Sequence, residues 1–204
     1  MMTSLALVRL LQLSSPALPI GAYSYSQGLE WAVETGTVHD EASAQRWIGD
    51  LLAGNLGRFE APYLADMLAA WRSDEIEQLQ VLDAEFLASR ETGELRAERL
   101  QMGYSLLRLL QDLPDFPPTV TRQLQTMAQP SFPLVWSAAA SAWETPIEEA
   151  LSAYLWAWAE NQAMAAIKAV PLGQTAGQRM LLEIGQRIPD VARPAMRLAD
   201  EEIT

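Results

Sequence analysis

The chain has 204 residues, half of them hydrophobic, and a formal net charge of −12 at pH 7. Its length suits one domain, and its acidity argues against nucleic acid, whose phosphates need a basic surface. The absence of cysteine excludes disulfides, thiolate metal sites and a cysteine nucleophile, and it fits a cytoplasmic protein. No apolar stretch reaches the ~20 residues of a membrane span, so we expect no membrane partner.

Apolar residues recur at helical spacing in the first quarter of the chain, where the alternation typical of strands is missing. The spacing predicts a first helix over 5–13, a second over 26–36 and a third that Asp40 caps. Between the first two helices lies SPALPIGAYSYSQGLE (residues 15–30), in which prolines and glycines restrict the backbone. We therefore expect this loop to follow a defined path.

The middle of the chain is also predicted to be helical. Pro62 suits the first turn of a new helix, and Asp74 with Glu77 predicts a capping box for the helix after it. The segment SRETGELR (residues 89–96) joins that helix to the next. The helices predicted here cover 74–88, 91–112, 120–127 and 133–143.

A long helix is predicted after Thr145 and Pro146, which suit the N-cap and the first helical position. It ends near Val170, and a further helix and a weaker one over 188–204 follow. Because every predicted element is helical, we expect an all-α, single-domain bundle of about ten helices over residues 1–204.

The residue types that carry most enzyme chemistry are missing or isolated. His39 is the single histidine, which disfavours a Ser-His pair, and no phosphate-binding glycine motif occurs. Carboxylates such as Glu30, Glu34 and Asp50 could hold a hard cation, but solvated helical acids are the more ordinary interpretation. We expect no enzyme activity, no catalytic residue, no metal site and no cofactor. The alternative is an all-α enzyme that uses buried carboxylates with a divalent cation.

Lys168 and the charged residues of the segment 89–96 need separate interpretations. Lys168 lies near the end of a helix that is apolar on nearly all sides, where a buried ammonium is costly unless it is paired. Either its stem carries the charge to solvent at the helix end, or it meets a carboxylate or a partner. The charges of residues 89–96 are most simply a solvated surface with charge pairs along the helix.

Three segments together resemble the UreF family of urease accessory proteins. They are LLQLSSPALPIGAYSYSQGLEWAVETG (residues 10–36), SRETGELR, and AIKAVPLGQTAGQRML (residues 166–181), in the family's order and at similar separations. The resemblance implies an all-helical cytoplasmic protein without catalysis of its own. It also implies a homodimer that bridges UreD (also called UreH) and the GTPase UreG, and that regulates GTP-dependent nickel insertion into apo-urease.

The resemblance also marks residues for partner binding or for the motifs themselves. They are Pro19, Gly21, Tyr23, Ser24, Ser26, Gly28, Glu30, Arg90, Glu91, Thr92, Lys168, Pro171, Gly173 and Gln174. Gly93 stands where family members often have arginine. The family usually continues into a C-terminal tail associated with UreD binding, and we expect this chain, which ends in LADEEIT, to lack that tail.

Overall fold

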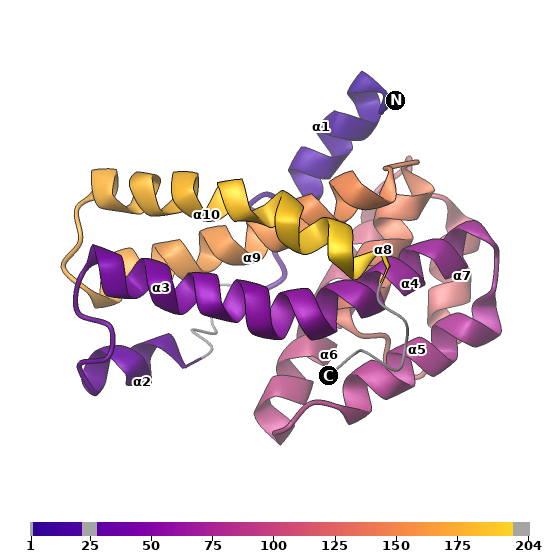
Figure 1. The fold of residues 1–204 in the computed structure, drawn as a ribbon. Coiled ribbons are helices and arrows are strands. Elements are labelled where there is room, and N and C mark those ends of the chain that lie inside the picture. Colours follow the sequence, from indigo (N-terminus) through magenta and orange to yellow (C-terminus); the bar gives the residue numbers. More distant parts are fainter. Residues whose placement is uncertain (1, 22–27, 198–204) are drawn as a thin grey trace. The chain divides into compact units, whose positions relative to one another are not determined.

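A computed structural model describes residues 2–21 and 28–197 (Figure 1). Within these ranges the chain forms ten α-helices and one π-helical segment and no strand, which confirms the predicted all-α class. The chain packs as two units: unit 1 comprises residues 1–21 and 63–150, and unit 2 comprises residues 22–62 and 151–204. The expectation of one domain stays a prediction.

Unit 1 is built around α6, which packs against α7 and α8. Its helices are α1 (Ser4–Leu13), most of α4 (Ala61–Arg72), α5 (Ile76–Ala88), α6 (Gly93–Asp112), α7 (Pro118–Gln125), α8 (Phe132–Ala142) and the first turn of α9 (Ile147–Ala169). The rings of Tyr63 and Phe86 meet edge to face with centroids 6.0 Å apart, which joins α4 to α5.

The approach of α6 to the start of α8 depends on Gly103. A Cβ at this position would lie 2.8 Å from the carbonyl carbon of Ser131 and 2.9 Å from the backbone nitrogen of Phe132. Because these are backbone atoms, they cannot rotate away as a flexible side chain would. Glycine therefore permits the close packing of these two helices.

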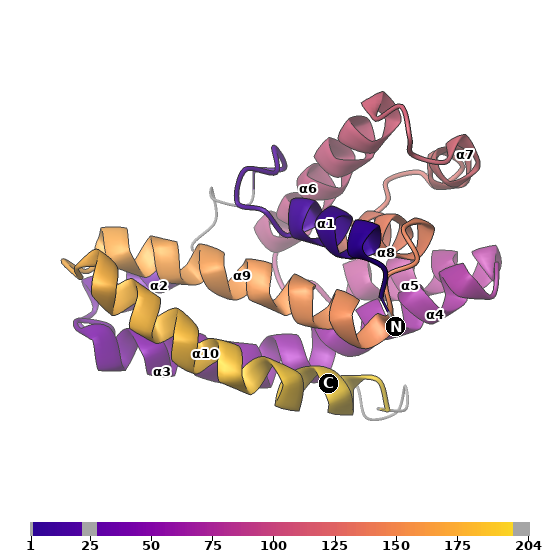
Figure 2. The same cartoon turned by 90° about the horizontal axis from the view of Figure 1, so that it is seen from above.

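Unit 2 contains α2 (Leu29–Glu34), α3 (Glu41–Leu51), the π-helical segment η2 (Leu52–Glu60), most of α9, and α10 (Gln174–Ala195). Figures 1 and 2 show α10 running alongside α3, and it contacts both α3 and η2. Arg179 of α10 donates two hydrogen bonds to the Glu41 carboxylate, at 2.9 and 2.5 Å. In the core of the unit, the Tyr154 hydroxyl donates to the buried carboxylate of Glu60.

The sequence predicted the start of α3 correctly. The Asp40 carboxylate accepts the Ser43 backbone N–H at 2.8 Å, and the Ser43 hydroxyl meets the Asp40 backbone N–H in return. These bonds satisfy donors that a helix N-terminus leaves without an intrahelical partner. They also lower the pKa of the Asp40 carboxyl, the Ser43 hydroxyl being the largest cause.

Two of the predicted helix starts were wrong in detail. Asp74 has a φ of 56° and accepts a hydrogen bond from Gln123, so it does not cap α5. The Thr145 hydroxyl is buried without a hydrogen-bond partner in the part of the chain that the structure describes, so it does not cap α9. Both errors come from assigning a side chain's role from local spacing, whereas the turn before each helix sets where the side chain points.

Pro62 lies in the first turn of α4, as the sequence predicts, because α4 begins at Ala61 directly after η2. One of the predicted helix boundaries was wrong. The last two predicted helices are one helix, α10, which contains Pro189 and Pro194. None of the helices in the described ranges is long and apolar enough to cross a membrane.

Candidate functional site

The motif residues marked by the sequence lie at helix ends and in the turns between helices. Tyr23, Ser24 and Ser26 lie outside the described residues. In unit 1, the others are Pro19, Gly21, Arg90, Glu91 and Thr92; in unit 2, they are Gly28, Glu30, Lys168, Pro171, Gly173 and Gln174.

The described ends of the first motif have the backbone control that its composition predicts. Gly21 and Gly28 have φ values of 78° and 87°, in the left-handed region that favours glycine. Gly28 is the N-cap of α2, and it places Glu30 in the first turn of that helix. The Glu30 side chain is exposed, and its negative charge suits the helix N-terminus. The motif thus sets where α2 begins and presents an acid beside that start.

The third motif forms the turn between α9 and α10. Lys168 lies in the last turn of α9 and is exposed, as are Pro171, Gly173 and Gln174. No ion pair involves Lys168 among the residues that the structure describes. Of the two interpretations left open by the sequence, the structure therefore supports a lysine that reaches solvent at the helix end.

The second motif joins α5 to α6, and two of its three marked residues stabilise the junction. The Arg90 guanidinium lies 4.4 Å from the centre of the Phe86 ring, within the range of a cation–π contact. The Thr92 hydroxyl accepts the Leu95 N–H at 3.2 Å and so caps α6. Glu91, between them, is exposed. This motif therefore fixes the junction and presents Glu91 at its surface.

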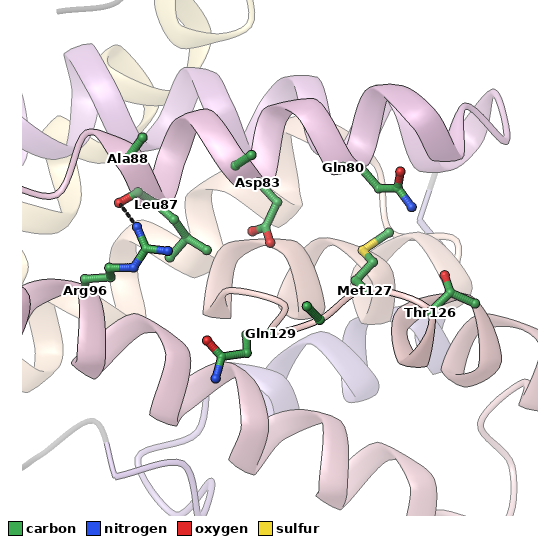
Figure 3. Close-up of a pocket in the computed structure, with 10 residues that line it drawn as sticks. Gln80, Asp83, Leu87, Ala88, Arg96, Thr126, Met127 and Gln129 are labelled. Carbon is green, nitrogen blue, oxygen red and sulfur yellow. Dashed lines mark hydrogen bonds between the residues drawn. The ribbon is translucent and has the colours of Figure 1, made fainter.

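Next to this junction unit 1 has a cleft of about 540 Å³, between α5, the start of α6 and the turn after α7 (Figure 3). That volume is within the roughly 300–1,000 Å³ of typical ligand pockets. Five polar and five apolar residues line the cleft. The polar ones are Gln80, Asp83, Arg96, Thr126 and Gln129; the apolar ones are Ala84, Leu87, Ala88, Met127 and Ala128.

The charged groups of the cleft are Asp83 and Arg96. Asp83 is only 7% exposed, and its two carboxylate oxygens accept the Ser131 backbone N–H at 3.2 and 3.4 Å. Burial raises the pKa of the Asp83 carboxyl to about 6, against the opposing effects of hydrogen bonds from Ser131 and the charge of Arg96. Arg96 donates to the Leu87 carbonyl at 3.2 Å. The cleft thus contains an acid that the protein solvates poorly.

Neither Asp83 nor the cleft was predicted from the sequence. A signal for Asp83 was present, because Leu79, Asp83 and Phe86 are spaced on one face of α5 and all three are buried. An acid on the apolar face of a helix is unusual enough to mark a candidate site. The cleft itself had no such signal, because its walls come from segments about forty residues apart.

The described residues contain no group of three or more His, Cys, Asp or Glu side chains that could hold a metal ion. His39, the single histidine, lies in the turn before α3. Its Nδ1 is 3.0 Å from the Gly36 carbonyl oxygen.

Comparison with known proteins agrees with the resemblance carried by the three motifs. The family profile described as UreF matches residues 38–185. The chain is 58% identical over 200 residues to the urease accessory protein UreF of Azoarcus sp. (strain BH72), covering 97% of this chain and 86% of that protein. It is 56% identical to the UreF of Dechloromonas aromatica (strain RCB) over 97% of this chain and 87% of that protein. The chain therefore belongs to the UreF family.

Proposed function

We propose that the chain is a urease maturation protein that acts by binding rather than by catalysis. It bridges UreD (UreH) and the GTPase UreG, and it regulates GTP-dependent nickel insertion into apo-urease in the cytoplasm. The observation that carries this proposal is the similarity, over 86% or more of their length, to proteins named urease accessory protein UreF.

The placement of the motif residues supports a binding role. Glu30, Glu91 and Lys168 are charged side chains of the motifs that lie exposed at helix ends, where the packing of the core does not require them. Exposed polar residues held by a rigid helical framework are suited to contacts with other proteins. We propose that these residues meet the partners and that the chain acts as a homodimer.

The proposal is tested in cells that express a urease and its other maturation proteins but have no UreF. Supplying this chain should restore urease activity and the nickel content of the purified urease. The Gly103→Ala variant, which we expect to be destabilised, is supplied from the same expression system as a control. It should restore less urease activity than the wild type. The proposal is contradicted if the wild-type chain is folded and abundant in these cells but neither the urease activity nor the nickel content of the urease increases.

A second arm tests the mode of action. The tagged chain should capture UreD. If the chain bridges UreD and UreG, UreD should bind UreG only when the chain is also present. Charge reversal at Glu30, Glu91 or Lys168 should reduce capture of one partner while leaving capture of the other unchanged. Capture of neither partner by the wild-type chain would show that binding is not its mode of action.

A further inference from the structure

Asp83 faces the cleft beside α5, where Arg96 is the nearby basic side chain among the described residues. Figure 3 shows its carboxylate pointing from α5 into the space bounded by Arg96 and by the turn that carries Met127 and Gln129. No basic side chain of the described residues forms an ion pair with it. The residues outside the described ranges, 1, 22–27 and 198–204, include no Lys, Arg or His. Arg96 acts on this carboxylate through its charge but forms no ion pair with it. A direct ion pair with Asp83 is therefore left for a cation of another molecule.

The carboxylate has capacity for such a partner. An ionised carboxylate has about four lone-pair directions, whereas both backbone contacts of Asp83 come from one N–H, at distances near the upper limit for a hydrogen bond. Arg96 lies at the same cleft, but its guanidinium is directed to the Leu87 carbonyl. An incoming cation would meet a poorly solvated acid rather than a completed ion pair.

The remaining walls of the cleft match the rest of a long basic side chain. Lysine and arginine bury a methylene stem along apolar surface while the charged head seeks a polar group. Leu87 and Met127 supply such apolar surface, and a methionine adapts readily to what it contacts. Unit 1 also has fourteen acidic and seven basic side chains, so its field attracts a basic partner.

We propose that this cleft binds a lysine or arginine side chain of a protein partner, whose charged head forms an ion pair with Asp83. The proposal rests on the binding function proposed above and adds a contact to it. A purely structural role for Asp83, in which it only holds the Ser131 N–H at the start of α8, is the competing explanation. Asparagine retains an acceptor for that N–H but has no charge, so Asp83→Asn separates the two roles.

The first test measures the cleft directly, with small probes. The methyl resonance of Met127 is followed by NMR while N-acetyl-arginine amide or N-acetyl-lysine amide is added, with the neutral N-acetyl-citrulline amide as control. We expect a saturable shift with at least one of the cations, none with citrulline, and none in Asp83→Asn. Glu85→Gln removes an exposed acid from the same helix outside the cleft and should keep the response. Equal responses to citrulline, or no response to either cation, would overturn the proposal.

The second test measures binding of UreD, UreG and apo-urease to the wild type and the variants. Asp83→Asn should weaken the affinity for one of them by at least about tenfold, as expected for a close charge pair, while Glu85→Gln should not. Thermal melting of the same samples excludes unfolding as the cause. If Asp83→Asn does not fold, Ala128→Lys replaces it, because Ala128 is exposed and lines the cleft. The ammonium of the introduced lysine should compete with the partner's basic side chain for Asp83. Ala128→Gln has no charge and should not compete.

The outcomes separate this inference from the proposed function. If the wild type binds partners and no variant changes any affinity, the cleft proposal is wrong and the proposed function stands. If the wild type binds none of the three proteins, the proposed function fails, and the Met127 titration alone decides whether the cleft accepts a basic side chain.

Discussion

Asp83 combines burial with a raised pKa, and at the scale of single residues it gives the clearest pH prediction. Its carboxyl has a pKa of about 6 in the folded protein, because of burial, against an ordinary value of 3.8. Between these values the folded state holds a proton that the unfolded state has lost. The contribution of Asp83 to the free energy of unfolding therefore falls as pH rises through this window, by up to about 3 kcal/mol.

Asp83→Asn removes this titration, so the variant should gain stability relative to the wild type as pH rises from 4 to 6. Urea denaturation at several pH values measures the difference in free energy of unfolding between the two proteins. A difference that stays constant across this range would show that the Asp83 carboxyl does not have a raised pKa.

Lys168 gives a second prediction at this scale, because its side chain is exposed at the end of α9. Substitutions of exposed residues usually change stability by less than about 0.5 kcal/mol. Lys168→Ala should therefore keep the melting temperature of the wild type while it weakens capture of UreG. Lys168→Arg retains the charge and should keep most of the capture. A large drop in melting temperature with a matching loss of capture would assign Lys168 to the fold instead.

At the scale of helices, the contact between α6 and α8 depends on the missing side chain of Gly103. Gly103→Ala would place a methyl group against the backbone of Ser131 and Phe132, and overpacking of this kind costs about 1–3 kcal/mol. Gly93→Ala, at the start of α6, has open space around its Cβ and should cost far less. Urea denaturation of both variants measures the contrast. Equal stabilities would show that the two helices can separate without cost.

The sequence predicted most helices because their signals are local. Asp40 begins α3 through its own neighbours, so spacing alone located it. The sequence predicted a separate helix from residue 188, yet α10 continues through this point and through Pro189, although a proline usually interrupts a helix. Buried residues on both sides of that proline, Ile184 and Ala192, belong to the same helix that contacts α3 and η2. Tertiary packing of this kind overrides a local propensity and cannot be seen in a local pattern.

The candidate sites show the same division between local and tertiary information. The motifs led to Arg90 and Thr92, whose contacts lie within a few residues, and the structure adds that these contacts stabilise the α5–α6 junction. The cleft needed the fold, because Asp83 meets Ser131 across a separation of 48 residues. No spacing rule connects positions so far apart.

At the scale of the whole molecule, the ligand inventory predicts weak nickel binding by this chain on its own. Nickel favours imidazole and thiolate ligands, and the chain has one histidine and no cysteine. Equilibrium dialysis of untagged protein should detect no stoichiometric submicromolar nickel site. Untagged protein is essential, since a polyhistidine tag would bind nickel itself. A tight site at one ion per chain would contradict this prediction and would assign the chain a carrier role.

The composition and the exposed surface of α1 also predict self-association of the chain. Half of the residues are hydrophobic, and four large apolar side chains of α1 are exposed: Leu5 (59%), Leu7 (43%), Val8 (60%) and Leu11 (62%). Exposed apolar surface of this kind usually marks an interface. Sedimentation velocity over a range of concentrations should show a monomer–dimer equilibrium. Because apolar association is not screened by salt, the dimer should persist at 1 M NaCl, where contacts between exposed charges are largely screened. A monomer at every concentration would contradict the proposed homodimer, and a dimer that dissociates in high salt would show that charge pairs, rather than apolar surface, hold it together.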